Sequence, residues 1–317
     1  MTRKYPKFCD PTNDWAFKRI FGSEQYKAAT IGFINSMLPE RQICDVEFLN
    51  VEIPGFTAED RKSCVDILCR GNDDSSFIIE MQIVEQEFFR QRTVLYASTL
   101  ISHLAEKGDR WDYELKPTYV ISVIDFRLND LVPEDCISHY VSQECRTGAV
   151  LPGAPEFFFL EPRRFEKKEN ELKTYQEKWL FLLRNAKSLS VIPETFAGDK
   201  AFDAYFSASE TANMTKEERI LYDQAMITKT DIEYGKLYSF KKGLAKGEAK
   251  GKAEGLAEGL VKGEAKGIEK GRKEGRKETQ KELAKKMLDD GFDISVVEKY
   301  TGIESSELRK LSLASLQ

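Results

Sequence analysis

The chain has 317 residues, of which 41% are hydrophobic and 32% are charged, and these proportions exclude a membrane-embedded or wholly disordered protein. The formal net charge of −5 argues weakly against a general nucleic-acid-binding surface, although lysine and arginine concentrate at 163–168 and 241–286. No apolar run approaches the roughly 20 residues of a membrane-spanning helix, and the N-terminus lacks a secretory signal pattern. We therefore expect a cytoplasmic protein without membrane contact, long enough for two or more structural units.

The cysteines and histidines argue against several kinds of site. His103 and His139 are the only histidines, too few for a histidine-rich metal site, and we expect packed or surface roles for both. The six cysteines lack the paired spacing of a structural zinc site, so we expect reduced thiols. They are Cys9, Cys44, Cys64, Cys69, Cys136 and Cys145.

Two helices are predicted near the N-terminus. Apolar residues recur at helical spacing after position 14, where Asn13 or Asp14 is suited to cap the helix and Gly22 to end it. A second helical pattern runs over 27–37. Both helices would precede the first strand.

The period then changes from helical to strand-like. Residues 43–53, 63–70 and 76–84 form short β-rich runs. The sequence Gly-Asn-Asp-Asp at 71–74 is a turn signal, so the last two runs are predicted to form an antiparallel hairpin.

After the hairpin, apolar residues recur at helical spacing over 85–107, and Gly108 is a stop signal. Residues 117–126 and 156–160 are predicted to be buried strands. The element order α-α-β-β-β-α-β-β predicts an α/β fold in which helices flank a mixed sheet.

We divide the chain into four regions. Residues 1–165 are the predicted α/β domain, and residues 166–240 are a helical extension. Over 241–278 glycine recurs at every fourth position among Ala, Lys and Glu. Each helical glycine costs about 0.8–1 kcal/mol against alanine, so this region is either a helix that pairs with a partner or a charged linker. Residues 279–317 form a small helical module, either helix-turn-helix-like or a protein-contact cap.

The hairpin carries two acidic residues in an apolar setting. Strand alternation places Asp66 on one face with Cys64 and Leu68, while Val65, Ile67 and Cys69 face the other way. On the partner strand, Glu80 and Gln82 share a face with Ile78. Antiparallel pairing therefore brings Asp66 near Glu80. Such a pair is costly without a counter-charge.

A hard divalent cation is the simplest counter-charge for these carboxylates. Mg²⁺ binds one or two carboxylates and keeps several water molecules, which suits a site for phosphodiester hydrolysis. Gln82 would then position the attacking water or contact the phosphate. Its amide cannot act as a general base at neutral pH.

This pattern resembles the PD-(D/E)XK nuclease motif. Asp66, thirteen intervening residues and Glu80-Met81-Gln82 match it, with Gln82 in the usual lysine position. Further residues resemble the Rpn family of recombination-promoting nucleases and transposase-like proteins. They are Asp14, Phe17-Lys18, Phe21-Gly22, Lys62, Arg90, Tyr96, the stretch 108–126 and the glycine-repeat tail.

The resemblance implies a fold, a cofactor and a set of site residues. It implies a restriction-endonuclease-like mixed sheet and a Mg²⁺ ion, for which Mn²⁺ can substitute, held by Asp66 and Glu80. Gln82 would be the third catalytic residue of the motif. Supporting roles are implied for four residues: Asp14 would approach the site, and Lys62, Arg90 and Tyr96 would contact phosphate or brace the carboxylates. From the residues alone, Asp14 is equally suited to cap its helix, Lys62 and Arg90 to be solvated, and Tyr96 to fill the core.

Three functions are consistent with the sequence. The first is a metal-dependent DNA endonuclease linked to recombination or mobile-element activity. The second is a catalytically impaired nuclease fold that binds DNA. The third is an oligomeric interaction protein, in which the glycine repeat joins copies of the chain. We expect a homo-oligomer, because two nuclease sites are needed to cut both strands in one encounter.

Overall fold

The computed structural model describes residues 5–53, 63–105, 114–128 and 135–314. The chain divides into two compact units, Met1–Tyr234 and Gly235–Gln317. The candidate site lies in the first unit, which contains all the strands in the described part of the chain.

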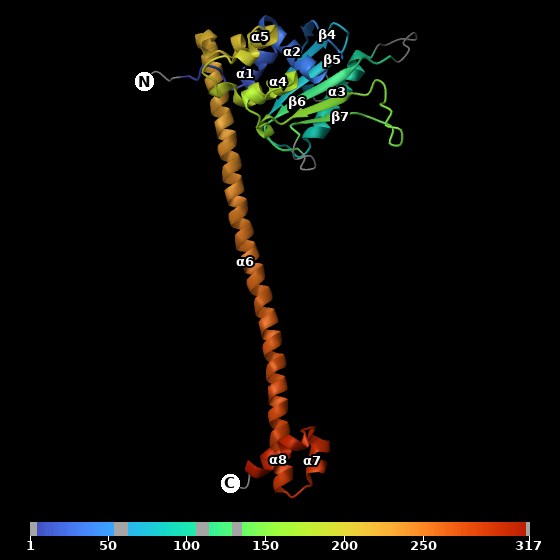
Figure 1. The fold of residues 1–317 in the computed structure, drawn as a ribbon, viewed down its shortest axis with the longest axis vertical. Helices are drawn as coiled ribbons and strands as arrows, with labels where there is room; N and C mark the ends of the chain where they lie inside the picture. The colour runs from blue at the N-terminus through green and yellow to red at the C-terminus, as the bar shows by residue number, and fades with distance from the viewer. Residues whose placement is uncertain (1–4, 54–62, 106–113, 129–134, 315–317) are drawn as a thin grey trace. The chain divides into compact units, whose positions relative to one another are not determined.

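A six-stranded mixed sheet forms the centre of the first unit (Figure 1). Its order is β1-β4-β5-β6-β8-β7, in which β5, β6 and β8 are mutually parallel and the other neighbours are antiparallel. The strands are β1 (Val46–Phe48), β4 (Ile67–Gly71), β5 (Ser76–Gln82), β6 (Thr118–Ile124), β7 (Ile137–Tyr140) and β8 (Glu156–Leu160). A separate pair joins β2 (Glu52–Ile53) to β3 (Ser63–Cys64).

Helices cover both faces of the sheet. On one face, four helices contribute to one buried cluster together with alternate residues of β4, β5, β6 and β8. These helices are α1 (Asp14–Phe21), α2 (Lys27–Met37), α4 (Tyr175–Asn185) and α5 (Lys200–Ser209). Helix α3 (Phe89–Leu104) covers the other face, where Ala97 and Leu100 pack against Leu68, Ile78 and Val120. The predicted α/β class, a mixed sheet flanked by helices, is confirmed.

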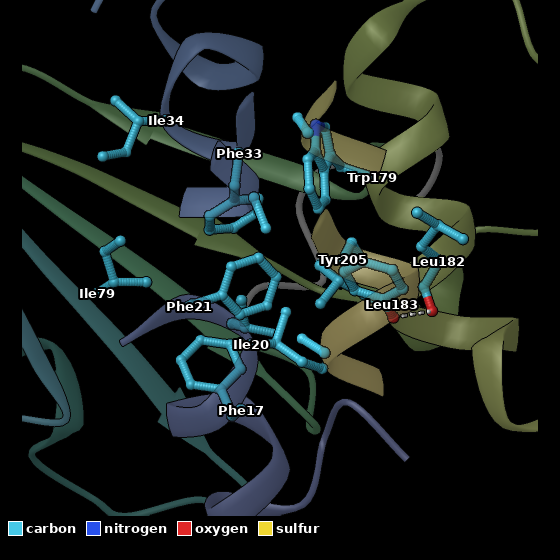
Figure 2. Packing of buried hydrophobic residues seen from close by; sticks show 14 of the residues in the cluster. Phe17, Ile20, Phe21, Phe33, Ile34, Ile79, Trp179, Leu182, Leu183 and Tyr205 are labelled. Carbon is cyan, nitrogen blue, oxygen red and sulfur yellow. Dashed lines mark hydrogen bonds between the residues drawn. The ribbon is translucent and has the colours of Figure 1, made fainter. Parts of the chain in front are cut away.

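Aromatic side chains fill the core between α1, α2, α4 and α5 (Figure 2). Trp179 of α4 is fully buried and lies against Phe21, Phe33 and Tyr205, with ring centroids 5.7–5.9 Å apart. Burying aromatic rings of this size contributes much of the stabilisation of such a core. The aromatic cluster therefore fixes α1, from which one side chain reaches the candidate site.

The N-terminal helices follow the sequence closely. Asn13, rather than Asp14, caps α1, because its side-chain oxygen accepts a hydrogen bond from the Ala16 N–H at 3.1 Å. Gly22 ends this helix, as predicted. Helix α2 has the predicted bounds of 27–37.

Several elements differ from the sequence-based expectation. The predicted run 43–53 is divided into β1 and β2, which belong to different sheets. Strand β7 was not predicted, because its Ile-Ser-His-Tyr sequence is short and only partly buried at the sheet edge. Helix α3 begins at 89 instead of 85. The predicted strand 63–70 is interrupted by a bend at Asp66, so Val65 packs with Leu68 and Ile78 instead of on the face of Ile67. The predicted stop signal at Gly108 lies outside the described residues.

The close approach of α2 and α5 depends on Gly32. A Cβ atom at this position would lie 2.3 Å from the Ala201 Cβ and 2.9 Å from the Tyr175 hydroxyl. We predict that Gly32→Ala lowers the free energy of unfolding by about 1–3 kcal/mol, despite the better helix propensity of alanine. Denaturant unfolding followed by tryptophan fluorescence measures this change. Gly235→Ala, in α6 outside the glycine repeat and with open space around its Cβ, is the control and should not destabilise the protein.

The second unit is helical. It contains most of α6 (Lys216–Asp289), together with α7 (Ile294–Thr301) and α8 (Ser305–Ala314). The glycine repeat is helical in this structure. At the C-terminal end, Ala284, Val297, Ile303 and Leu308 form a small buried cluster. Gly302, with φ of 71°, adopts the left-handed conformation that ends α7.

None of the helices in the described ranges combines the length and apolar character needed to span a bilayer.

Candidate active site

Asp66 and Glu80 lie beside each other where the inner strand β5 ends and its neighbour β4 begins. The register pairs Ile67 with Ile79, so Asp66 and Glu80 are the next residues along the two antiparallel strands. The Asp66 N–H donates to Glu80 Oε1 at 3.2 Å, and the Met81 N–H donates to Asp66 Oδ2 at 2.8 Å. Each carboxylate thus accepts a hydrogen bond from the backbone of the opposite strand. The juxtaposition predicted from the hairpin is present.

Strand alternation explains where Glu80 lies, and a backbone hydrogen bond holds Asp66 beside it. Ile78, two residues before Glu80, packs under α3, and alternation along β5 directs Glu80 to this same face. The bend at Asp66 interrupts the alternation on the other strand, where the Met81 N–H holds the Asp66 carboxylate. On the opposite face Ile67, Ile79 and Met81 belong to the main core. A shift of one residue in the register would place the apolar residues outside and the acidic ones inside the main core.

The carboxylate pair is electrostatically unbalanced. Glu80 is only 4% exposed, and burial, reinforced by the negative charge of Asp66, raises its pKa from 4.5 to about 8. The Asp66 N–H, Arg92 and Lys18 oppose this shift without cancelling it. The charged form of Glu80 is therefore disfavoured without a further counter-charge.

Lys18 of α1 is the cation that contacts the pair. Its ammonium lies 3.2 Å from Asp66 Oδ1 and 2.8 Å from Asp14 Oδ1. Partial burial alone would lower the pKa of Lys18, but the hydrogen bonds and charges of Asp14 and Asp66 raise it. Asp14 itself is exposed and is linked to the site through Lys18.

Gln82 lies two residues beyond Glu80 on the same face. Its Oε1 accepts a hydrogen bond from Arg92 Nη2 at 2.7 Å, and its Nε2 donates to the Val84 carbonyl at 2.8 Å. The Arg92 guanidinium also lies 5.7 Å from the centroid of the Tyr96 ring, one helical turn further along α3. The start of α3 therefore closes one side of the site.

The other predicted site residues differ in how far they are buried. Tyr96 is partly buried, and burial raises its pKa, as do the charges of Glu80 and Asp66, while Arg92 lowers it. Arg90 is exposed and lies two residues from Arg92, roughly 200° around the helix. Lys62 lies outside the described residues.

Sequence reasoning missed the role of Arg92 and treated Lys18 only as part of a family resemblance. Both residues have a local signal. Lys18 follows Asp14 by four residues, and Arg92 precedes Tyr96 by four, the spacings at which side chains on one helix face meet. Which sheet residue each cation contacts depends on long-range packing, which these spacings do not reveal.

A large cavity lies elsewhere in the described part of the chain. Its volume is about 990 Å³, and it opens beyond the end of β6, where Asp125, Glu161, Arg163 and Arg164 are among its lining residues. These charges pair with one another: Arg163 binds Asp125, and Arg164 lies 3.6 Å from Glu161. We therefore place the candidate site at the unbalanced carboxylate pair and not in the cavity.

The donor set at the pair limits which metal would fit. Within the described ranges, no cluster of three or more His, Cys, Asp and Glu side chains is arranged to hold a metal ion. Two carboxylates, with the remaining positions open to water and substrate oxygens, are the set that Mg²⁺ accepts. A zinc site would need more nitrogen or sulfur ligands.

Comparison with known proteins identifies the family. A model of the family described as PD-(D/E)XK nuclease family transposase matches residues 11–239. This span contains Asp66, Glu80, Gln82 and the whole central sheet. Comparisons with curated proteins and with solved structures found no match. The Rpn-like residues predicted this family. Because the match covers well over half of the chain, the chain belongs to the PD-(D/E)XK nuclease family transposases.

Proposed function

We propose that the protein is a metal-dependent DNA endonuclease, which hydrolyses phosphodiester bonds with Mg²⁺ held by Asp66 and Glu80. Family membership supports a nuclease-like function. The observation that carries the proposal is a pair of neighbouring carboxylates at the end of β5, one of them buried, each of which accepts a hydrogen bond from a backbone N–H of the opposite strand.

The residues present fit a divalent cation. Burial and the charge of Asp66 raise the pKa of Glu80, and a divalent cation held by the two carboxylates would stabilise their charged forms. When bound, Mg²⁺ supplies Lewis-acid activation of the attacking water and neutralises charge on the phosphate. The backbone N–H groups of Asp66 and Met81 hold the carboxylates in place for this task.

The remaining side chains would orient the substrate. We propose that Gln82 contacts the attacking water or the phosphate, and that Tyr96 braces the carboxylates from α3. Lys18 would balance the charge of Asp66. Asp14 and Arg90 have weaker support, because both are exposed and only Asp14 is joined to the site by a contact, through Lys18.

A plasmid-cleavage assay tests the proposal. The full-length protein should nick or linearise supercoiled DNA in Mg²⁺ or Mn²⁺, and EDTA should abolish the cleavage. Strongly salt-dependent DNA binding without cleavage in either metal would contradict the enzyme and support the alternative of a catalytically impaired DNA-binding protein. A role in mobile-element activity, suggested by the word transposase in the family description, or in recombination would require that the breaks be used in strand exchange.

We also propose that the protein acts as a homo-oligomer through its glycine repeat. In α6, the glycines from Gly243 to Gly275 have no neighbouring atom within 4 Å of an added Cβ, and Leu256, Leu260 and Ile268 on the same helix are exposed. A helix with this many glycines is marginal alone, because each costs about 0.8–1 kcal/mol against alanine. Light scattering should show that the full-length protein is oligomeric and that a chain ending before Gly243 is not. If the full-length and the shortened protein were both monomeric at micromolar concentration, this result would contradict the proposed oligomer.

A further inference from the structure

We propose that Arg92 is a positioning residue, which orients the Gln82 side-chain amide so that Gln82 offers an N–H to a substrate oxygen instead of offering its carbonyl to the metal. This inference rests on the proposed nuclease function. It assigns an orientation to the side-chain amide of Gln82, which occupies the usual lysine position of the motif. It also adds Arg92, which the motif does not contain, to the site.

Two partners fix the direction of the amide. Arginine has only donors, so the atom of Gln82 that faces Arg92 Nη2 must be the oxygen. A backbone carbonyl only accepts, so the atom that faces the Val84 oxygen must be the nitrogen. Turning the amide over would set donor against donor and acceptor against acceptor at once. The orientation thus follows from chemistry on both sides.

Arg92 is itself held in place. Its guanidinium packs over the rings of Phe89 and Tyr96, with the carbon 5.2 and 5.7 Å from the two centroids. A second donor, Nη1, binds Gln86 Oε1. The Nε atom is buried and has no hydrogen-bond partner in the described part of the chain. The bonds to Gln82 and Gln86 use two of the five N–H groups of this partly buried guanidinium, and losing the Gln82 oxygen would leave another donor unpaired.

The orientation has a chemical consequence. One hydrogen of Gln82 Nε2 is used by the Val84 carbonyl, and the second is left for another acceptor. Gln82 is partly exposed, whereas Glu80 beside it is buried. A neutral donor at this position would bind an anionic phosphate oxygen or the attacking water, as a lysine would, without adding a charge. Metal binding would then rest on Asp66 and Glu80 without Gln82.

A double-mutant cycle on the full-length protein tests whether Arg92 acts through Gln82. Q82M should lower the cleavage rate about 100-fold, the usual cost of losing one donor to the reacting group. R92M should lower it about tenfold or more in the wild-type background, but by less than about twofold in Q82M. Additive losses would overturn the assignment. Melting curves check folding, and R92L replaces R92M in the cycle if that variant does not fold.

Two further measurements test the direction of the amide. Q82E keeps the acceptor for Arg92 but has no N–H, so it should be as inactive as Q82M, and a fully active Q82E would overturn the donor role. In calorimetric titrations with Mg²⁺, Q82M should change Kd by less than about twofold, whereas D66N should weaken binding at least about tenfold. Equal weakening by both would make Gln82 a ligand and overturn the inference.

Failure of the inference differs from failure of the proposed function. A wild-type protein that neither binds Mg²⁺ nor cleaves DNA would overturn both. A wild-type nuclease whose Q82M and R92M losses are additive would overturn only the role of Arg92.

Discussion

Asp66→Asn is expected to abolish metal-dependent DNA cleavage. The substitution keeps the shape of the side chain and an oxygen for the Met81 N–H, but it removes the charge that would hold the cation. We expect the cleavage rate to fall by roughly 1000-fold or more, which corresponds to about 4 kcal/mol of transition-state stabilisation. Initial rates on supercoiled plasmid at saturating Mg²⁺ measure the loss. Glu80→Gln should be equally inactive.

Glu47→Gln is the matched control. Glu47 is an exposed carboxylate in the same sheet, paired at 2.6 Å with Arg70 near the far end of β4. Its loss should leave the cleavage rate within about twofold of wild type, because exposed ion pairs contribute little. Equal activity of Asp66→Asn and Glu47→Gln would show that the carboxylate pair does not perform the reaction.

Glu80 should make the metal-free protein less stable as the pH rises. Its pKa is about 8 in the folded protein and about 4.5 when exposed, so the folded state binds more protons between these values. The stabilisation is complete below pH 4.5 and is lost as the pH rises to about 8. We expect a loss of a few kcal/mol in the free energy of unfolding over this window, at about 1.4 kcal/mol per pKa unit. Denaturant unfolding in EDTA across this pH range measures it.

Glu80→Gln isolates this contribution. The variant cannot ionise at this position, so its stability should fall less steeply with pH, and above pH 8 it should exceed that of the wild type. Burial also raises the pKa values of Asp125 and Glu161, but these groups contribute the same slope to both proteins. Parallel pH profiles for the two proteins would contradict the buried, protonated Glu80.

Much of the fold could be predicted from local patterns. Helix α2 and strand β8 have their predicted bounds, and the turn at 71–74 joins the predicted hairpin. The pairing that brings Asp66 next to Glu80 followed from the predicted hairpin, and the face of Glu80 followed from alternation along β5. These features depend on residues close together in the sequence, where periodicity and turn chemistry are strong signals.

The remaining features depend on contacts between distant segments. Periodicity indicated helices near Trp179 and Tyr205, but not that both would pack against Phe21 of α1. The bend at Asp66 was hidden for the same reason, because Val65 turns to meet the α3 face only in the folded sheet.

The candidate site shows the same division. The hairpin predicted the two carboxylates, whereas the cations beside them come from α1 and α3, which follow their own helical periods. Lys18 reaches Asp66 across 48 positions of sequence, and the contact between Arg92 and Gln82 needs the chain to fold back from β5 into α3. Charged residues on exposed helix faces are common, so neither contact could be assigned from the sequence.

Anomalous diffraction from crystals soaked in Mn²⁺ tests the central claim most directly. The account predicts one manganese peak within about 2.2 Å of an oxygen of Asp66 and of an oxygen of Glu80, with its other positions open to solvent. Manganese bound to only one of these carboxylates, or bound elsewhere while both remain free, would contradict a shared metal ion at the end of β5.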